Sequence, residues 1–250
     1  WIWVATTTAA AYFRIAKSRG SDVVRAIFGE SFKGIIVGDR WSAYTVIPAE
    51  RRQVCWAHLK RDFQKFIDRG GRGTAFGEEG LRLTKDLFIV RHSHETAEIS
   101  HRAMQRRMAG LETEVGELLG DGLKSAVKKV RGFCKKLSEL SPSLFLFTRV
   151  TGVEPTNNRA ERALRPVVLW RKGSFGTSSA EGSLFVARIM TVVMTSRLQG
   201  RTVLGYLQEV CAAQDWGDPI PSLFGTRSRD GPRIPMKVLS NSGRRRCQRH

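Results

Sequence analysis

The chain has 250 residues, of which 41% are hydrophobic, with 13 Phe and 6 Trp, and this composition excludes an intrinsically disordered protein. The 42 Lys and Arg outnumber the 23 Asp and Glu, giving a formal net charge of +19, so nucleic acid is the expected partner. No apolar run approaches the roughly 20 residues needed to cross a bilayer, so we expect no membrane partner.

The first 72 residues alternate between strand and helix patterns. Residues 1–8 are rich in Trp, Ile, Val and Thr and predict a strand, and residues 21–28 predict a short helix with an apolar face. The apolar run at residues 34–38 predicts a central strand buried on both faces, and it ends in Asp39. The carboxyl end of such a strand is where open α/β sheets place ligand sites.

Shorter elements follow. The pattern predicts a brief helix at residues 42–44, a strand at residues 52–56 and a helix at residues 57–67. The glycine cluster at residues 70–73 is typical of a linker. We therefore expect the first part of a core at residues 1–72.

Residues 73–145 carry helix-type patterns and no strand signal, which predicts an α-helical insertion of two or three packed helices. Its many Lys and Arg are explained either by a solvated helix face or by a groove for DNA. We expect the core to resume at residues 146–215, and a basic, flexible tail at residues 216–250 that touches DNA phosphates only non-specifically.

One stretch within the second part of the core concentrates charge. Asn157 or Asn158 can cap a helix, which would place Glu161 in the first turn. This sets one carboxylate among five cations, and we expect these to bind DNA: Arg159, Arg162, Arg165, Arg171 and Lys172. Such a cluster suits a site that holds a metal and grips phosphates, but Asn158 with Glu161 also fits a capping box.

The residues after this stretch predict a Gly- and Ser-rich loop at 173–181, a helix capped by Ser183 and a further helix from Thr202. Phe175 and Trp170 flank the basic cluster. An aromatic ring there could stack on an unpaired base, or it could pack in the core.

Asp39 and Glu161 are the two acids that could converge from a strand and a helix. Together they could bind Mg²⁺, with Mn²⁺ as a substitute, and two such ions would support in-line phosphoryl transfer. A lone Asp after a strand more often caps a turn.

The cysteines and histidines favour no zinc site. Cys55 and His58 have a C-x-x-H spacing but are only two ligands of the four expected, so we expect Cys55 to be buried and His58 to lie near the DNA or the metals. The four cysteines form no CxxC pair, which indicates free thiols in a reducing compartment.

Three segments carry a resemblance to a known family. They are Val37-Gly38-Asp39-Arg40-Trp41-Ser42-Ala43-Tyr44, then Cys55-Trp56-Ala57-His58-Leu59-Lys60-Arg61-Asp62-Phe63, then Asn157-Asn158-Arg159-Ala160-Glu161-Arg162-Ala163-Leu164-Arg165-Pro166 with Arg171-Lys172 after it. In this order and spacing, over roughly residues 1–210, they resemble the insertion sequence 66 family of bacterial DDE transposases.

The resemblance implies an α/β fold with a ribonuclease-H-like mixed sheet flanked by helices and an α-helical insertion before the third acid. It implies cleavage and joining of transposon ends and target DNA with two Mg²⁺ ions, in the bacterial cytoplasm at the nucleoid. Synapsis of two ends generally requires more than one subunit, which would make a homo-oligomer in a synaptic complex a further partner. Asp39 would be the second acid and Glu161 the third, both metal ligands.

The family's first acid lies in a strand upstream of the segment that matches residues 1–7, and this sequence starts after it. We therefore expect a fragment that does not catalyse alone. A non-catalytic DNA-binding remnant and a metal-dependent nuclease of the same fold are the alternatives.

Overall fold

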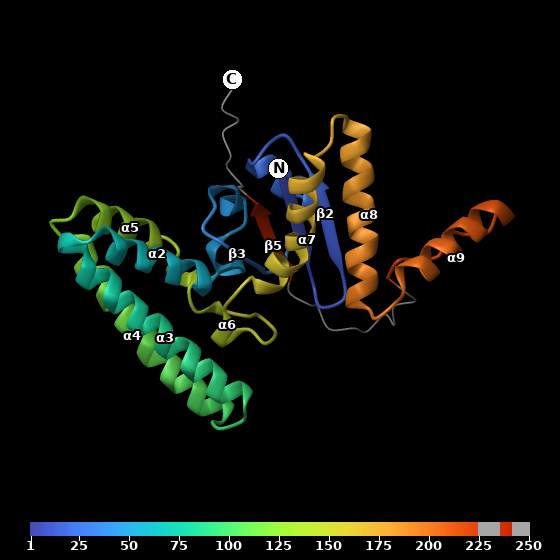
Figure 1. Cartoon of the computed structure of the whole chain (residues 1–250). Coiled ribbons are helices and arrows are strands. Elements are labelled where there is room, and N and C mark those ends of the chain that lie inside the picture. Colours follow the sequence, from blue (N-terminus) through green and yellow to red (C-terminus); the bar gives the residue numbers. More distant parts are fainter. Residues whose placement is uncertain (225–235, 242–250) are drawn as a thin grey trace, which may run out of the picture. The chain divides into compact units, whose positions relative to one another are not determined.

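The computed structural model describes residues 1–224 and 236–241. Chain contacts divide it into two compact units (Figure 1). The first unit combines Trp1–Val46 with Asn157–His250, and the second is Ile47–Thr156. No helix in the described part of the chain is long and apolar enough to cross a membrane.

The first unit is built on a mixed sheet with strand order β2-β1-β5-β3. Its described elements are β1 (Ile2–Thr6), β2 (Ala11–Ile15), α1 (Ser21–Phe28), β3 (Ile36–Gly38), α7 (Asn158–Ser174), α8 (Ala180–Leu198), α9 (Val203–Trp216) and β5 (Met236–Asn241). Strand β1 is antiparallel to both β2 and β5, and β3 is parallel to β5. All five β1 residues and all three β3 residues are buried. The apolar run at residues 34–38 predicts this burial for β3.

Strand β5 corrects the expectation of a flexible tail over residues 216–250. Met236–Asn241 pair with β1 along its whole length, from Thr6 opposite Lys237 to Ile2 opposite Asn241. The segment therefore lies inside the sheet, between two strands that come from the start of the chain. The rest of the predicted basic tail, residues 225–235 and 242–250, lies outside the described residues.

Strand β2 is a second element that the sequence pattern did not predict. It follows β1 through a tight turn in which the Thr7 backbone N–H donates to the Ala10 carbonyl, and the Thr7 hydroxyl accepts from the Ala9 and Ala10 N–H groups. Threonine can stabilise a turn in this way, but the turn lacks the Gly, Asn or Asp that signals a hairpin.

Helices α7 and α8 of the first unit pack against this sheet (Figure 1). The core joins small and branched residues of α7 to the inward faces of β1 and β2: Ala160, Ala163, Leu164 and Val167 with Ile2, Val4, Ala11 and Phe13. Helix α8 also covers the edge of β2 with threonines one turn apart. Thr191 accepts from the Phe13 N–H, and Thr195 bonds both the N–H and the carbonyl of Ala11. The edge strand is thereby protected from pairing with another chain.

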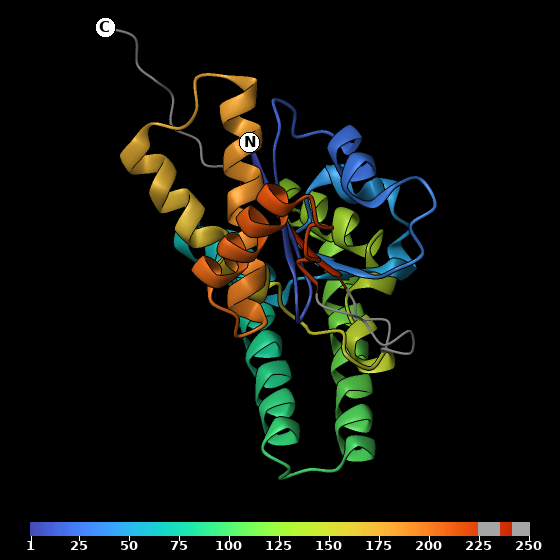
Figure 2. The same ribbon diagram turned by 90° about the vertical axis from the view of Figure 1, so that its right-hand side faces the viewer.

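The second unit is mainly helical. Its described elements are β4 (Arg52–Val54), α2 (Trp56–Arg69), α3 (Thr74–Glu95), α4 (His101–Lys124), α5 (Lys128–Ser138) and α6 (Leu146–Arg149), with single 3₁₀ turns between some of them. Figure 2 shows α3 and α4 as a long antiparallel hairpin. The unit extends beyond the predicted insertion at residues 73–145 because α2 packs on α3.

The packing of α2, α3 and α5 rests on four phenylalanines. Phe63, Phe66, Phe76 and Phe133 contact one another with ring centroids 5.1–5.8 Å apart, mostly edge to face. Nearby, burial raises the pKa of the Cys134 thiol to about 11, so this cysteine stays protonated at neutral pH and acts as a core residue.

Helix α3 approaches α2 so closely at Gly80 that only glycine fits there. We therefore expect an alanine substitution to destabilise the protein at Gly80 and to stabilise it at an unhindered glycine, Gly116. A Cβ built on Gly80 would lie 2.2 Å from a ring carbon of Phe63, which is itself buried. We expect Gly80→Ala to lower the free energy of unfolding by about 1–3 kcal/mol, because the core there cannot expand freely.

Gly116 in α4 is the matched control. A Cβ built there meets nothing within 4 Å. Gly116→Ala should therefore raise the free energy of unfolding by about 0.5–1 kcal/mol, through helix propensity alone. Urea denaturation followed by circular dichroism measures both; stabilisation by Gly80→Ala would contradict the packing described here.

Candidate functional site

Asp39 directly follows β3 at the carboxyl end of this strand, as the sequence predicts. Its side chain is half-buried, and one carboxylate oxygen accepts the backbone N–H of Trp41 at 3.0 Å. This is the local turn that an Asp after a strand commonly forms. The bond helps to fix the orientation of the carboxylate.

Glu161 lies in the first turn of α7, but it is not part of the expected capping box. The helix begins at Asn158, and the residue before it, Asn157, is the N-cap and makes no side-chain capping bond. A capping box pairs the N-cap with the third helical residue, which here is Ala160. The pairing of Asn158 with Glu161 is therefore wrong, because Asn158 is already inside the helix.

Asp39 and Glu161 belong to the same unit although the whole second unit separates them in the chain. The apolar face of α7 packs on the inner strands of the sheet, and Glu161 lies on the flank of that face, half-buried. The sheet thus positions Asp39 at a strand end, and the helix packed on this sheet positions Glu161.

The five predicted cations do not form one cluster. Arg165 follows Glu161 by one turn on the same flank of α7, while Arg159 and Arg162 point to other flanks. Arg171 and Lys172 lie nearly three turns further on, about 15 Å along the helix axis. Pro166 lies inside this continuous helix between them, where it lacks a backbone N–H to donate. The positive charge is therefore distributed along the whole helix.

The motif around His58 is largely structural. Cys55 and Trp56 are fully buried, as expected, but Trp56 is the first residue of α2 rather than the end of a strand. The Trp56 indole N–H donates to the Leu144 carbonyl at 2.7 Å, and its backbone N–H donates to the Pro155 carbonyl. His58 is half-buried in the first turn of α2, in the second unit.

The described side chains do not gather a set of metal ligands in one place. Within residues 1–224, where side chains are described, no group of three or more His, Cys, Asp and Glu residues is placed to hold a metal ion. Asp39 and Glu161 offer the carboxylate oxygens that Mg²⁺ prefers, but they do not make up a full set of ligands. The described residues alone therefore do not fit a two-ion catalytic centre.

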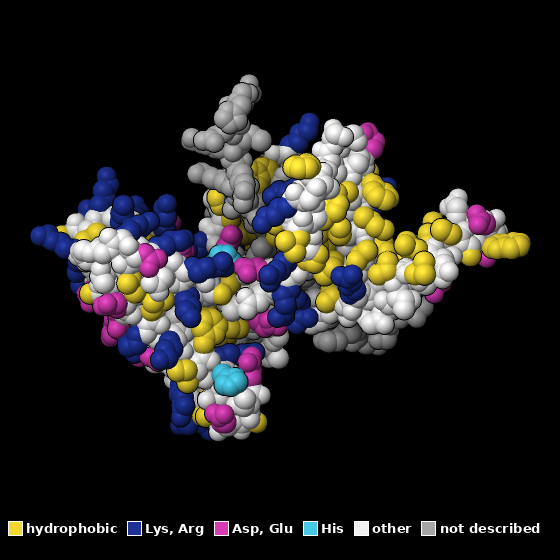
Figure 3. Space-filling view, in the orientation of Figure 1, with side chains coloured by type: hydrophobic (Ala, Val, Ile, Leu, Met, Phe, Trp, Pro, Cys, Tyr) yellow, Lys and Arg dark blue, Asp and Glu magenta, His cyan; other side chains and the backbone are white. Residues whose placement is uncertain are grey.

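The surface adds a further basic region on the second unit. Lys and Arg side chains gather over α5 (Figure 3). The exposed residues there are Lys128, Lys129, Arg131, Lys135 and Lys136. An exposed stripe of this kind attracts phosphates in a salt-dependent way.

The first unit also contains a cavity that the sequence pattern did not reveal. Its volume is about 1090 Å³, and residues of β2, the end of α7 and the start of α8 line it. Of its cations, Arg14, Lys17 and Arg188 were not singled out from the sequence, and Arg171 was. These four cations can be grouped only when it is known that β2 is a strand and that it lies beside α8.

Comparison with known proteins places the chain in a family. The model of the transposase IS66 family matches residues 1–184. Two proteins of Sinorhizobium fredii (strain NBRC 101917 / NGR234), uncharacterized proteins y4qI and y4hP, are each 26% identical to the chain over 225 and 231 residues. The matches cover 82% of this chain and 40% of each relative. No solved structure matches the chain.

The family match begins at Trp1 and includes Asp39, His58 and the helix that carries Glu161. More than half of the chain is therefore accounted for by one family, and the three motifs of the sequence occur within the matched range. The chain belongs to the transposase IS66 family.

Proposed function

We propose that this chain is part of the DNA-binding core of a DDE-type transposase. The observation that carries the proposal is the family match over residues 1–184, which includes strand β3, directly followed by Asp39, and the helix α7 that carries Glu161. The mixed sheet, with antiparallel β1 and β2 and helices packed on it, supports a ribonuclease-H-like core. The helices of residues 73–145 would be the insertion before the third acid.

In this proposal Asp39 and Glu161 are two of the acids that hold Mg²⁺ or Mn²⁺ in the complete enzyme. When bound, the ions would stabilise the charge on the attacking and leaving oxygens of the phosphodiester. Arg159, Arg162 and Arg165 would hold phosphates beside Glu161, and His58, Arg171 and Lys172 would contact DNA further out. Because the described acids do not complete a metal centre, the chain alone is proposed to bind DNA without cutting it.

Synapsis of two transposon ends would need more than one subunit, so the proposed partners are transposon and target DNA and a second copy of the protein. A metal-dependent nuclease would need the same acids. The other alternative, a non-catalytic DNA-binding remnant, would not need these acids, because DNA binding would be its entire function.

DNA binding is tested by measuring the affinity of the chain for fluorescent duplex DNA at several salt concentrations. We expect an affinity that falls by at least about 100-fold between 50 and 200 mM salt, because binding by Lys and Arg releases counterions. Asp39→Asn and Glu161→Gln should leave this affinity within about two-fold, since each removes a negative charge and no phosphate contact. Binding that does not respond to salt would contradict the proposal.

A further inference from the structure

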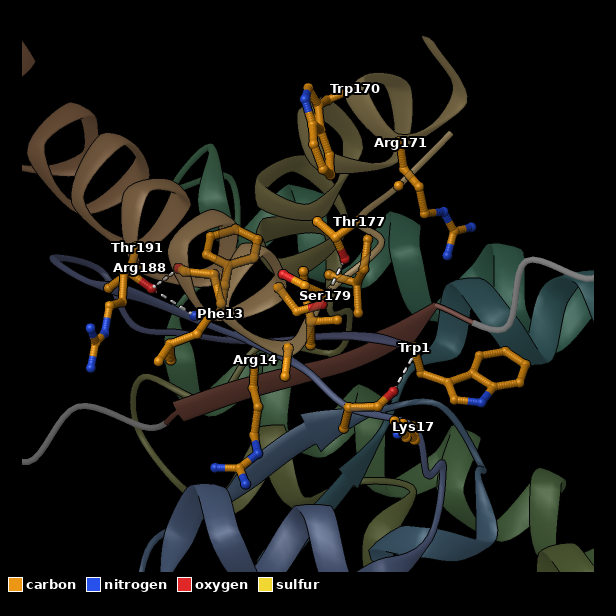
Figure 4. A pocket seen from close by; sticks show the side chains of 18 of the residues that line it. Trp1, Phe13, Arg14, Lys17, Trp170, Arg171, Thr177, Ser179, Arg188 and Thr191 are labelled. Atoms are coloured by element: carbon orange, nitrogen blue, oxygen red, sulfur yellow. Dashed lines mark hydrogen bonds between the residues drawn. The ribbon is translucent and has the colours of Figure 1, made fainter. Parts of the chain in front are cut away.

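The cavity of the first unit lies between β2, the last turn of α7 and the first turns of α8 (Figure 4). Its volume of about 1090 Å³ is at the upper limit of ligand pockets, which span about 300–1,000 Å³. A single small metabolite would leave most of it empty. The occupant is therefore expected to be larger than one small molecule.

The electrostatic character of the cavity favours an anion. Arg14 belongs to β2, and Lys17 follows the end of this strand by two residues. Arg171 belongs to α7 and Arg188 to α8. Figure 4 shows these four side chains on different sides of the cavity rather than in one cluster. No acidic side chain is among the described residues that line it. Charge spread in this way suits an extended polyanion better than a single phosphate.

Aromatic rings line the same cavity. Phe175 is 95% exposed, so of the two alternatives that the sequence left open for it, packing in the core is wrong. Trp170 and Trp1 are half-buried. Phe175 also has a left-handed backbone, with φ of +59°, at the C-cap of α7. Glycine normally occupies such a position, and a bulky residue there is strained. Strained residues concentrate at binding and active sites.

The loop that joins α7 to α8 contributes hydroxyl groups. Ser179 caps α8 by accepting the Gly182 N–H at 2.9 Å, and Thr177 and Ser183 share a hydrogen bond of 2.6 Å. The cavity runs along one side of this 19-residue helix and includes its first turn, where the partial positive charge of the helix N-terminus adds to the field of the four cations.

We propose that this cavity binds an unpaired DNA strand, with phosphates held by Arg14, Arg171 and Arg188 and bases stacked on Phe175 and Trp170. A basic groove combined with exposed aromatic rings is how proteins bind single strands without sequence preference. Bases in a duplex are already stacked on each other and do not offer their faces. The inference rests on the proposed DNA function and adds the state of the DNA at this position.

The first test removes the exposed ring. Anisotropy of the whole chain with a labelled oligo(dT) of about 12 nucleotides and with a duplex of the same length compares the two ligands. We expect Phe175→Ala to weaken single-strand binding by about 5-fold or more and duplex binding by less than two-fold. Phe185→Ala is the control, because Phe185 is an exposed ring on α8 that does not line the cavity.

The second test removes charge at two positions of one helix. Arg188→Ala and Arg197→Ala each delete one exposed cation from α8, but only Arg188 lines the cavity. Arg188→Ala should weaken single-strand binding several-fold and lower the slope of log affinity against log salt by about 0.7. Arg197→Ala should change neither by a comparable amount.

These experiments distinguish failure of single-strand binding in the cavity from failure of the proposed DNA binding by the chain. Equal losses for Arg188→Ala and Arg197→Ala, or no loss for Phe175→Ala, would overturn the cavity as a strand-binding site while duplex binding persists. A chain that binds neither DNA would overturn both.

Discussion

Replacing Glu161 by Gln in a form of the protein that is competent for strand transfer is expected to reduce strand transfer by more than about 100-fold. Loss of a hydrogen-bonding partner behind a metal ligand already costs about 10- to 100-fold, so loss of a proposed ligand should cost more. Gln keeps the size of Glu and one oxygen but removes the charge that attracts Mg²⁺. The assay is joining of labelled terminal inverted repeats to target DNA in Mg²⁺.

Two companion variants sharpen this experiment. Asp39→Asn should have an effect of the same size, and its amide oxygen can still accept the Trp41 N–H, so the local turn is preserved. Glu181→Gln is the control, because Glu181 occupies the first turn of α8 and is exposed. If Glu161→Gln and Glu181→Gln were equally active, the assignment of Glu161 as a metal ligand would be wrong.

Gln53→Met is expected to lower the free energy of unfolding by about 3–5 kcal/mol, a large part of the 5–15 kcal/mol typical of a folded protein. The Gln53 amide is buried and makes three hydrogen bonds. It donates to the carbonyls of Val54 and Leu144, and it accepts the N–H of Phe147 at 2.9 Å. Methionine fills a similar volume, so the loss comes from the three hydrogen bonds themselves and from the buried Phe147 N–H, which loses the Gln53 oxygen as its acceptor.

Gln64→Met provides the matched control. Gln64 lies on the exposed side of α2 and bonds only Asp68, so its replacement should change stability by less than about 0.5 kcal/mol. Urea denaturation followed by far-ultraviolet circular dichroism measures both variants. A Gln53→Met protein as stable as Gln64→Met would show that this network does not hold β4 to residues 144–147.

The same network explains why the motif Cys55-Trp56-Ala57-His58 matters structurally. Trp56 and Gln53 both donate to the Leu144 carbonyl, and the Trp56 N–H donates to Pro155. These hydrogen bonds hold residues 53–56 against residues 144–155, which are distant in the sequence and lie just before α7. A tryptophan in this motif therefore contributes to folding rather than to contact with DNA.

The sequence by itself determined the family, the strand that Asp39 directly follows, the helix that carries Glu161 and the helical nature of residues 74–138. These features depend on local patterns: an apolar run, a periodicity of 3.6 residues and motifs of adjacent residues. The helix limits were less certain, since Ser179 and not Ser183 caps α8.

Only the tertiary structure decided the features that depend on contacts between segments far apart in the sequence. The six residues of β5 have no strand signal strong enough to predict, and they form a strand because β1 and β3 offer backbone groups on both sides. Helix geometry separated Arg171 and Lys172 from Glu161, although all lie within twelve residues. The cavity exists because β2, α7 and α8 meet in space, and no local pattern encodes that meeting.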